Sequence, residues 1–171
     1  MLDGRDNHGI IKFDEKVYTF GGSNMDAAEI YTIDDNRWDG LPPLPKQGVT
    51  NSCIRSHNDI FITSWSFSEL LRFDTQSQVY YQYDIRLKEY HYKSLLAVEK
   101  RIYLLAEAET YVISTDGRIL STFEGGLPYN IDQFFVMKNG IIYCVDEDGT
   151  VYSYEQLTDL RPKEIVDLFK V

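Results

Sequence analysis

Residues 9–22 read GIIKFDEKVYTFGG, and this stretch decides the fold. Two short apolar runs flank Asp14-Glu15-Lys16, a polar segment of the kind that forms turns. Such a pair of runs around a tight turn predicts a β-hairpin. The same arrangement returns further along the chain, so the hairpin is the first part of an internal repeat.

The repeat is marked by an aromatic residue at a matching place in four apolar segments. These residues are Tyr18, Phe61, Tyr103 and Tyr143, at intervals of 43, 42 and 40 residues. A turn and another apolar segment precede each of them. Asn139-Gly140 is the strongest of these turn signals, because both residues tolerate positive φ.

A third strand follows each hairpin, and a fourth is readable in three of the repeats. The third strands are expected at residues 29–34, 69–74, 110–114 and 150–154, and the fourth at 37–38, 79–83 and 118–123. Four short strands about every forty residues are typical of one blade of a β-propeller. A lone sheet of this kind exposes two apolar faces, so neighbouring blades must cover it.

We therefore predict an all-β chain whose residues 1–155 form about four four-stranded propeller blades. The predicted blades span about residues 5–48, 49–90, 91–130 and 131–155. In the tail, 156–171, Pro162 fits a first helical turn and Ile165, Val166, Leu168 and Phe169 make an apolar stripe. This pattern predicts a short C-terminal helix.

The first repeat also carries a more specific pattern. Within residues 5–48 it contains, in order, His8-Gly9, Gly21-Gly22, Tyr31, Trp38 and Leu41-Pro42-Pro43-Leu44-Pro45. This pattern resembles a repeat of the kelch family of β-propellers. The resemblance implies that the double glycine lets the chain bend out of the second strand, and that the Tyr and Trp pack between blades.

The other three repeats depart from the kelch pattern. Thr63-Ser64, Leu105-Ala106 and Asp146 replace the glycine pair, and Tyr80 stands near the place of Trp38. Kelch propellers usually have about six or seven blades, within a general range of about four to eight. The chain is then, in order of preference, part of a larger propeller, an open arc completed by a partner or a second copy, or a closed ring of four blades.

The charge of the chain disfavours some classes of partner, and its cysteine content indicates a cellular compartment. The formal net charge of −10, with no basic cluster, argues against nucleic acid and anionic membranes as partners. Two cysteines, Cys53 and Cys144, are too few for a disulfide framework, and buried free thiols in a reducing compartment are the simplest interpretation. A single disulfide between the two is the alternative. Without an apolar leader at the N-terminus or a membrane-length apolar run, the expected location is cytoplasmic.

The sequence shows no catalytic motif, so we predict that the chain is not an enzyme and needs no cofactor. His8, His57 and His91 share no short metal-ligand spacing, and no metal site is expected. The alternatives to an enzyme are a protein-interaction scaffold, which we prefer, and a structural subunit of a large assembly such as a cytoskeletal or ciliary complex. A propeller enzyme is the least favoured hypothesis.

Aromatic residues between strands are the candidates for partner binding. In kelch propellers the loops after the second strand and those between blades share the face where protein partners dock. The candidate residues in these loops are Trp65, Phe67, Tyr90, His91, Tyr92 and Tyr129. Aromatics are enriched at interface hot spots, but they also pack into seams between blades. The partner protein itself is not identifiable from the sequence.

Overall fold

The chain forms four antiparallel sheets of four strands each in the part that the structure describes. This computed structural model describes residues 1–48, 50–64, 68–83, 85, 93–98, 100–106, 109–124, 131–136, 142–146, 151–154 and 163–164. In every sheet the strands are hydrogen-bonded in sequence order. The predicted all-β class with about four four-stranded blades is confirmed.

The bounds of the strands follow the repeat. Blade 1 contains β1 (Gly9–Phe13), β2 (Lys16–Phe20), β3 (Ala28–Thr32) and β4 (Arg37–Leu41). Blade 2 contains β5 (Thr50–Ser56), β6 (Asp59–Ser64), β7 (Leu70–Asp74) and β8 (Val79–Tyr83). Blade 3 contains β9 (Lys93–Val98), β10 (Arg101–Ala106), β11 (Glu109–Ser114) and β12 (Ile119–Glu124). Blade 4 contains β13 (Ile131–Val136), β14 (Ile142–Asp146), β15 (Val151–Tyr154) and β16 (Lys163–Glu164).

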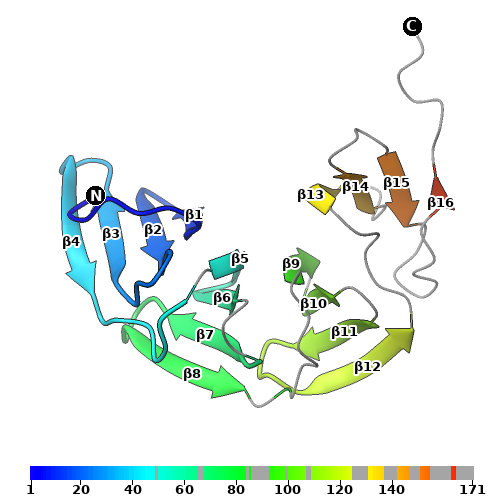
Figure 1. Ribbon diagram of the computed structural model, residues 1–171. Coiled ribbons are helices and arrows are strands. Elements are labelled where there is room, and N and C mark those ends of the chain that lie inside the picture. The colour runs from blue at the N-terminus through cyan, green and yellow to red at the C-terminus, as the bar shows by residue number, and fades with distance from the viewer. Residues whose placement is uncertain are drawn as a thin grey trace, which may run out of the picture.

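The four sheets fan about a common centre (Figure 1). The first strand of each blade lies innermost and the fourth lies outermost, and β5 lies beside both β1 and β9. The described strands form an open arc, with blades 1 and 4 at its two ends (Figure 1). This is the arrangement of propeller blades, and it differs from two sheets stacked face to face in a sandwich.

The hairpin turns align the first two blades residue by residue. Asp14 and His57 hold the same place in the turn after the first strand, with φ of 52° and 55°. Asn36 and Gln78 do so in the turn after the third strand, with φ of 48° and 56°. Asp, Asn and His adopt this left-handed conformation more often than other L-residues, so three of these four turns, at Asp14, Asn36 and His57, could be predicted from the sequence. Equivalent turn residues of blades 1 and 2 are therefore separated by 43 residues in the first hairpin and by 42 residues in the turn after the third strand.

Aromatic side chains fill the seam between blades 1 and 2. The Phe73 ring of β7 lies 5.5 Å from the Phe20 ring and 6.2 Å from the Tyr18 ring, measured between centroids. Ile60 and Ile62 join this seam from β6, whereas Phe61, between them, packs toward blade 3. Side chains alternate across a strand, so a middle blade buries both of its faces. Each large side chain buried in this way contributes about 1.5–3 kcal/mol to folding.

The prediction of a short C-terminal helix is wrong for the two residues of that segment that the structure describes. Lys163 and Glu164 form the short strand β16, which pairs with Ser153 and Tyr152 of β15 and supplies the fourth strand that the sequence did not reveal. Pairing with an edge strand satisfies backbone groups that a free edge would leave unpaired. The rest of the predicted helix lies outside the described residues.

The described part of the chain contains no helix long and apolar enough to span a membrane.

Candidate functional site

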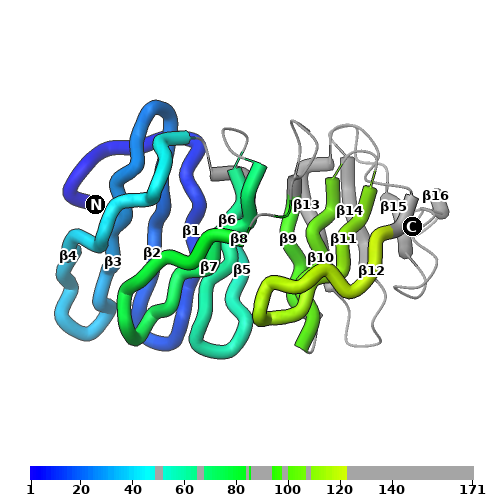
Figure 2. Tube along the Cα trace, turned by 90° about the horizontal axis from the view of Figure 1, so that it is seen from below, coloured from blue at the N-terminus to red at the C-terminus, as the bar shows by residue number. Residues whose placement is uncertain are grey.

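One side of the arc carries the β2–β3 loop and the described part of the linker that follows β4 (Figure 2). We call this side the loop face. Backbone hydrogen bonds tie three of its segments together: Ser23 donates to the Asp6 carbonyl over 3.0 Å, Gly22 to Gly48 over 3.4 Å and Leu44 to Asp26 over 2.7 Å. The N-terminal segment, the β2–β3 loop and the first linker therefore form one connected surface.

The double glycine makes this close approach possible. Gly21 and Gly22 have φ of 64° and 136°, which is conformational space that glycine enters most easily. A Cβ on Gly22 would stand 3.0 Å from the Asp6 carbonyl oxygen and 3.3 Å from the Arg5 Cβ. The glycine pair thus turns the chain out of β2, as the kelch resemblance implies, and also leaves room for the N-terminal segment.

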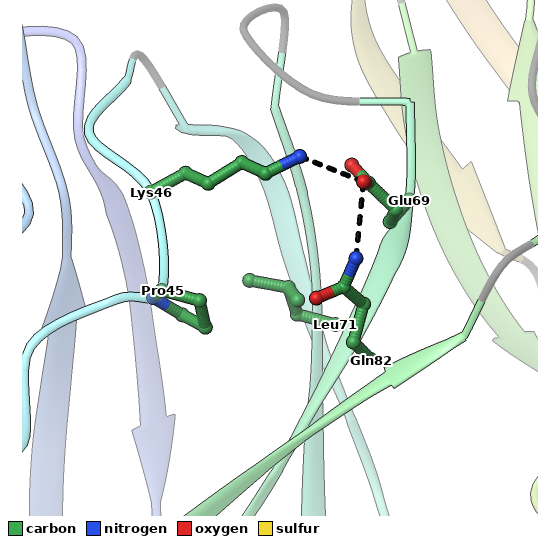
Figure 3. A pocket seen from close by; sticks show the side chains of 5 residues that line it. All are labelled: Pro45, Lys46, Glu69, Leu71 and Gln82. Carbon is green, nitrogen blue, oxygen red and sulfur yellow. Dashed lines mark hydrogen bonds and ion pairs between the residues drawn. The ribbon is translucent and has the colours of Figure 1, made fainter.

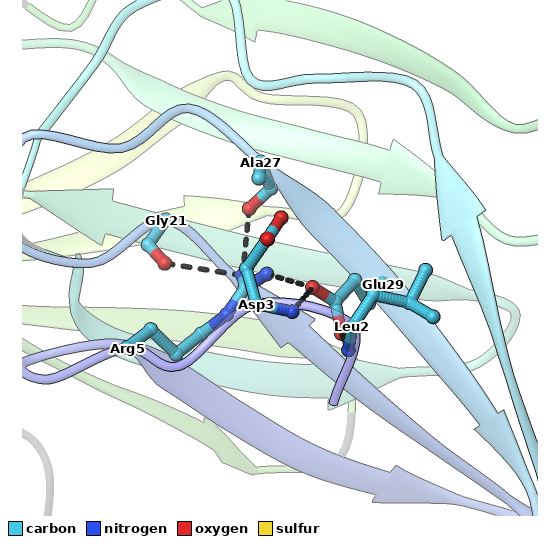
Figure 4. A network of polar contacts seen from close by, with 6 residues as sticks. All are labelled: Leu2, Asp3, Arg5, Gly21, Ala27 and Glu29. Carbon is cyan, nitrogen blue, oxygen red and sulfur yellow. Dashed lines mark hydrogen bonds and ion pairs between the residues drawn. The ribbon is translucent and has the colours of Figure 1, made fainter.

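A buried ion pair holds the N-terminal segment against blade 1 (Figure 4). The Arg5 guanidinium contacts the Glu29 carboxylate and donates to the carbonyls of Gly21, over 3.2 Å, and Ala27, over 2.8 Å. The Leu2 amide donates to the same carboxylate over 2.9 Å. The Arg5 and Glu29 side chains are 0% and 3% exposed, so each charge depends on the other. Sequence analysis did not find this pair, because neither residue belongs to a recognisable motif.

A shallow depression opens on the loop face between the first linker and blade 2 (Figure 3). Glu69 accepts hydrogen bonds at Oε1 from Lys46 Nζ, over 2.7 Å, and from Gln82 Nε2, over 3.0 Å. Pro45 and Leu71 supply apolar walls. The hydrogen bond from Lys46 holds the pKa of Glu69 below its usual range, so this carboxylate is ionised at neutral pH.

The size of the depression limits what it can accept. Its space of about 160 Å³ includes open solvent, whereas pockets for small ligands usually measure about 300–1,000 Å³. The depression is therefore a shallow surface feature and offers no enclosed site for a small molecule.

The titratable residues of the described chain do not converge on a metal site. No group of three His, Cys, Asp or Glu residues within the described ranges is placed to hold a metal ion. Burial, followed by the charge of Arg5, lowers the pKa of His8. His57 occupies the hairpin turn between β5 and β6, and His91 lies outside the described residues. Burial raises the pKa of the Cys53 thiol to about 12, which keeps it protonated and a poor nucleophile.

The residues predicted to bind a partner all fall in segments that the structure leaves undescribed. They are Trp65, Phe67, Tyr90, His91, Tyr92 and Tyr129. The described residues that flank the first two are Ser64, at the end of β6, and Ser68, which precedes Glu69 of the depression. The prediction for these six residues therefore stays a prediction.

Comparison with known proteins supports a kelch-like propeller. No family model matches the chain. Kelch-like protein 7 of Rattus norvegicus and of Mus musculus are each 33% identical to it over 66 residues, which cover 36% of this chain and 11% of the relative. The chain thus spans about a tenth of the length of the curated relatives that it matches.

Solved structures of similar fold are larger propellers. Virginiamycin B lyase from Staphylococcus aureus has a TM-score of 0.71 at 14% identity, over 94% of this chain and 56% of that one. A streptogramin B lyase has a TM-score of 0.74 at 12% identity, over 96% of this chain and 56% of that one. The chain spans just over half of each lyase.

These structures correct one prediction from the sequence. The expectation that the chain is not an enzyme is contradicted, because the similar solved structures reported above are enzymes, namely lyases. That expectation rested on the lack of a recognisable motif, and catalytic residues carried on the loops of a propeller need not form a motif in sequence. At 12% and 14% identity the likeness shows the fold and assigns no reaction to this chain.

Proposed function

We propose that the chain is a propeller module that docks a protein partner on its loop face. The match to Kelch-like protein 7 favours a protein-interaction propeller over other uses of the fold. The identity of the partner is left open by this proposal.

The observation that carries the proposal is the depression around Glu69. Its polar groups are already fixed, because Lys46 and Gln82 both donate to the Glu69 carboxylate. A docking surface that is ordered in advance loses less conformational entropy on binding. Apolar walls around the Lys46–Glu69 ion pair suit a partner side chain that brings both an aliphatic stem and a polar group.

The proposed anchors are the aromatics of the loop segments, above all Trp65 and Phe67, with Tyr92 as a third. Glu69 follows Phe67 by two residues in sequence, and this short separation is the reason for choosing the first two. Aromatic side chains provide large contact area and lose little rotamer entropy on binding.

Alanine replacement tests the proposal. Trp65→Ala and Tyr92→Ala variants, immobilised beside the unchanged chain, are used to capture partners from cell extract, and thermal unfolding confirms that each variant is folded. The matched control is Tyr81→Ala, which removes a 41% exposed aromatic from the outer strand β8. We expect Trp65→Ala and Tyr92→Ala to lose a partner that Tyr81→Ala retains. Retention of every partner by all three variants would refute the proposed face.

A further inference from the structure

The β2–β3 loop, residues 21–27, is closed at its base by the side chain of Arg5. Gly21 and Ala27 stand at the two ends of the loop, and the Gly21 amide donates to the Ala27 carbonyl over 3.0 Å. Arg5 Nη1 donates to the carbonyls of both residues (Figure 4). Because the Arg5 side chain is wholly buried, these bonds are shielded from water and fix the two ends of the loop together.

A second set of contacts holds the middle of the same loop. Ser23 donates from its amide to the Asp6 carbonyl over 3.0 Å, and the Asn7 side-chain amide donates to the Ser23 hydroxyl over 3.2 Å. Residues 2–7 therefore lie across the loop from its base to its middle, and we call them the strap.

The buried pair of Arg5 and Glu29 keeps the strap in place. The Glu29 carboxylate contacts the Arg5 guanidinium and accepts hydrogen bonds from the amides of Leu2, over 2.9 Å, and Asp3, over 3.3 Å. Three residues of the strap thus meet one carboxylate on β3, so a change at this pair affects the whole strap.

The other side of the loop holds an arch of the first linker, residues 44–48. At one end of the arch, Leu44 donates to the Asp26 carbonyl over 2.7 Å and is buried in the seam between blades 1 and 2. At the other end, Gly48 donates to the Met25 carbonyl over 3.2 Å. Both ends of the arch are therefore fixed to the loop that the strap holds.

Lys46 lies between these two ends and reaches across to blade 2 (Figure 3). Its Nζ atom donates to Glu69 Oε1 over 2.7 Å, while the rest of the side chain is half exposed. Ordering a long, exposed lysine side chain costs conformational entropy, so such an ion pair forms most readily where the backbone already points at the partner. The position of the arch therefore decides whether Lys46 meets Glu69.

We propose that Arg5 is a positioning residue for the depression on the loop face, because it acts through the β2–β3 loop and the arch to place Lys46 on Glu69. The coupling follows one continuous series of hydrogen bonds from the strap to the loop, the arch and blade 2. The inference rests on the proposed function for the use of the depression, whereas the placement of Lys46 can be measured without a partner.

Amide hydrogen exchange, followed by nuclear magnetic resonance, tests the inference. Arg5→Met combined with Glu29→Leu removes the Arg5 hydrogen bonds to the loop without leaving a charge buried. We expect the Leu44 and Gly48 amides of this double variant to exchange faster by about tenfold or more than in the unchanged chain. The Gln78 amide, which is hydrogen-bonded in the turn between β7 and β8 of blade 2, should keep its rate.

The ionisation of Glu69 provides a second readout, at the side chain that Lys46 contacts. Glutamate carboxyl resonances are titrated with acid, and the Glu69 resonance is the one missing from Glu69→Gln. We expect the pKa of Glu69 to rise in the double variant toward its value in Lys46→Met, in which the cation itself is absent. Arg37→Met, which breaks an exposed ion pair of the same blade, should leave this pKa unchanged.

Arg5→Lys makes the test independent of how well the double variant folds. It keeps a cation beside Glu29 but loses the planar guanidinium fork, so it should show the same two changes to a smaller extent. The inference is overturned if the Leu44 and Gly48 amides keep their rates in both variants, if Gln78 accelerates equally, or if the pKa of Glu69 does not rise. Neither readout involves a partner, so failure here is distinguishable from failure of the alanine test of the proposed function.

Discussion

The Tyr83 ring of blade 2 lies against Gly117, in the turn between β11 and β12 of blade 3. A Cβ on Gly117 would stand 2.1 Å from the Tyr83 Cδ1 atom, which is too close for two non-bonded carbon atoms, so one of them would have to move. Gly117 also has φ of 86°. The outer part of the seam between blades 2 and 3 therefore depends on one residue without a side chain.

Gly117→Ala should destabilise the chain by about 2 kcal/mol or more, because it combines overpacking with a strained backbone. Equilibrium unfolding in urea measures the loss. Gly40→Ala is the matched control, since a Cβ there meets nothing within 4 Å. Equal stability of the two variants would show that Tyr83 does not pack on Gly117.

The buried pair of Arg5 and Glu29 gives a second prediction. Arg5→Met should cost about 3 kcal/mol, because it leaves the Glu29 carboxylate buried without its cation. Combining it with Glu29→Leu should restore most of the loss, since the equivalent residue of blade 2 is Leu71.

Arg37→Met is the control for that pair. It breaks an ion pair with Asp39 in which the two side chains are 66% and 44% exposed, and it should change the stability by less than about 1 kcal/mol. Denaturant unfolding of these three variants, measured beside the unchanged chain, tests the prediction. If Arg5→Met costs no more than Arg37→Met, the N-terminal segment is not held as described.

Cys53 should react slowly with a thiol reagent. Burial raises its pKa to about 12, so the thiolate that reacts is scarce at neutral pH. In a Cys144→Ser variant, the rate of disulfide exchange with an aromatic disulfide should be low for the folded chain and should rise sharply in denaturant. Rapid reaction under native conditions would contradict the packing of the partly buried Cys53 in the seam between blades 1 and 2.

Glu69 should make stability depend on pH in the acidic range. Its folded-state pKa lies below its ordinary value because of the Lys46 hydrogen bond, so the contribution is complete above the unfolded pKa of about 4.3. The contribution is lost as the pH falls from there through the folded-state pKa. Lys46 is half exposed, so the contribution is small, at most about 1 kcal/mol.

Glu69→Gln and Lys46→Met should each flatten the stability profile over that acidic range, and the double variant should flatten it no further. Thermal unfolding measured from neutral pH to below pH 4 provides the profile. Additive effects of the two substitutions would mean that the two side chains do not interact.

Sequence analysis predicted most of the fold, because the repeat is local. Apolar strands, turn residues and an aromatic at a fixed interval located the hairpins of all four blades. It failed at β16, since the two residues Lys163 and Glu164 are too short a strand to leave a pattern, and Pro162 with the apolar stripe after it indicated a helix. Strand pairing at a blade edge took precedence over that local preference.

The candidate site was less accessible to sequence analysis. Arg5 meets Glu29, and Lys46 meets Glu69, only after the blades have assembled, at sequence separations of 24 and 23 residues. Nothing in the spacing of charged residues selects these two pairs among the many others in an acidic chain. The role of the glycine pair could be predicted in part, because positive φ is a requirement of the local backbone. The close approach of the N-terminal segment could not be predicted, because it depends on residues distant in sequence.

Nuclear Overhauser contacts between aromatic side chains test the propeller most directly. The account predicts cross-peaks between ring protons of Phe20 and Phe73, whose centroids lie 5.5 Å apart on neighbouring sheets, and their loss in a Phe73→Leu variant. An assigned spectrum in which Phe20 contacts blade 3 or 4 but not Phe73 would show that the sheets are stacked in some other way and would contradict the fan of blades.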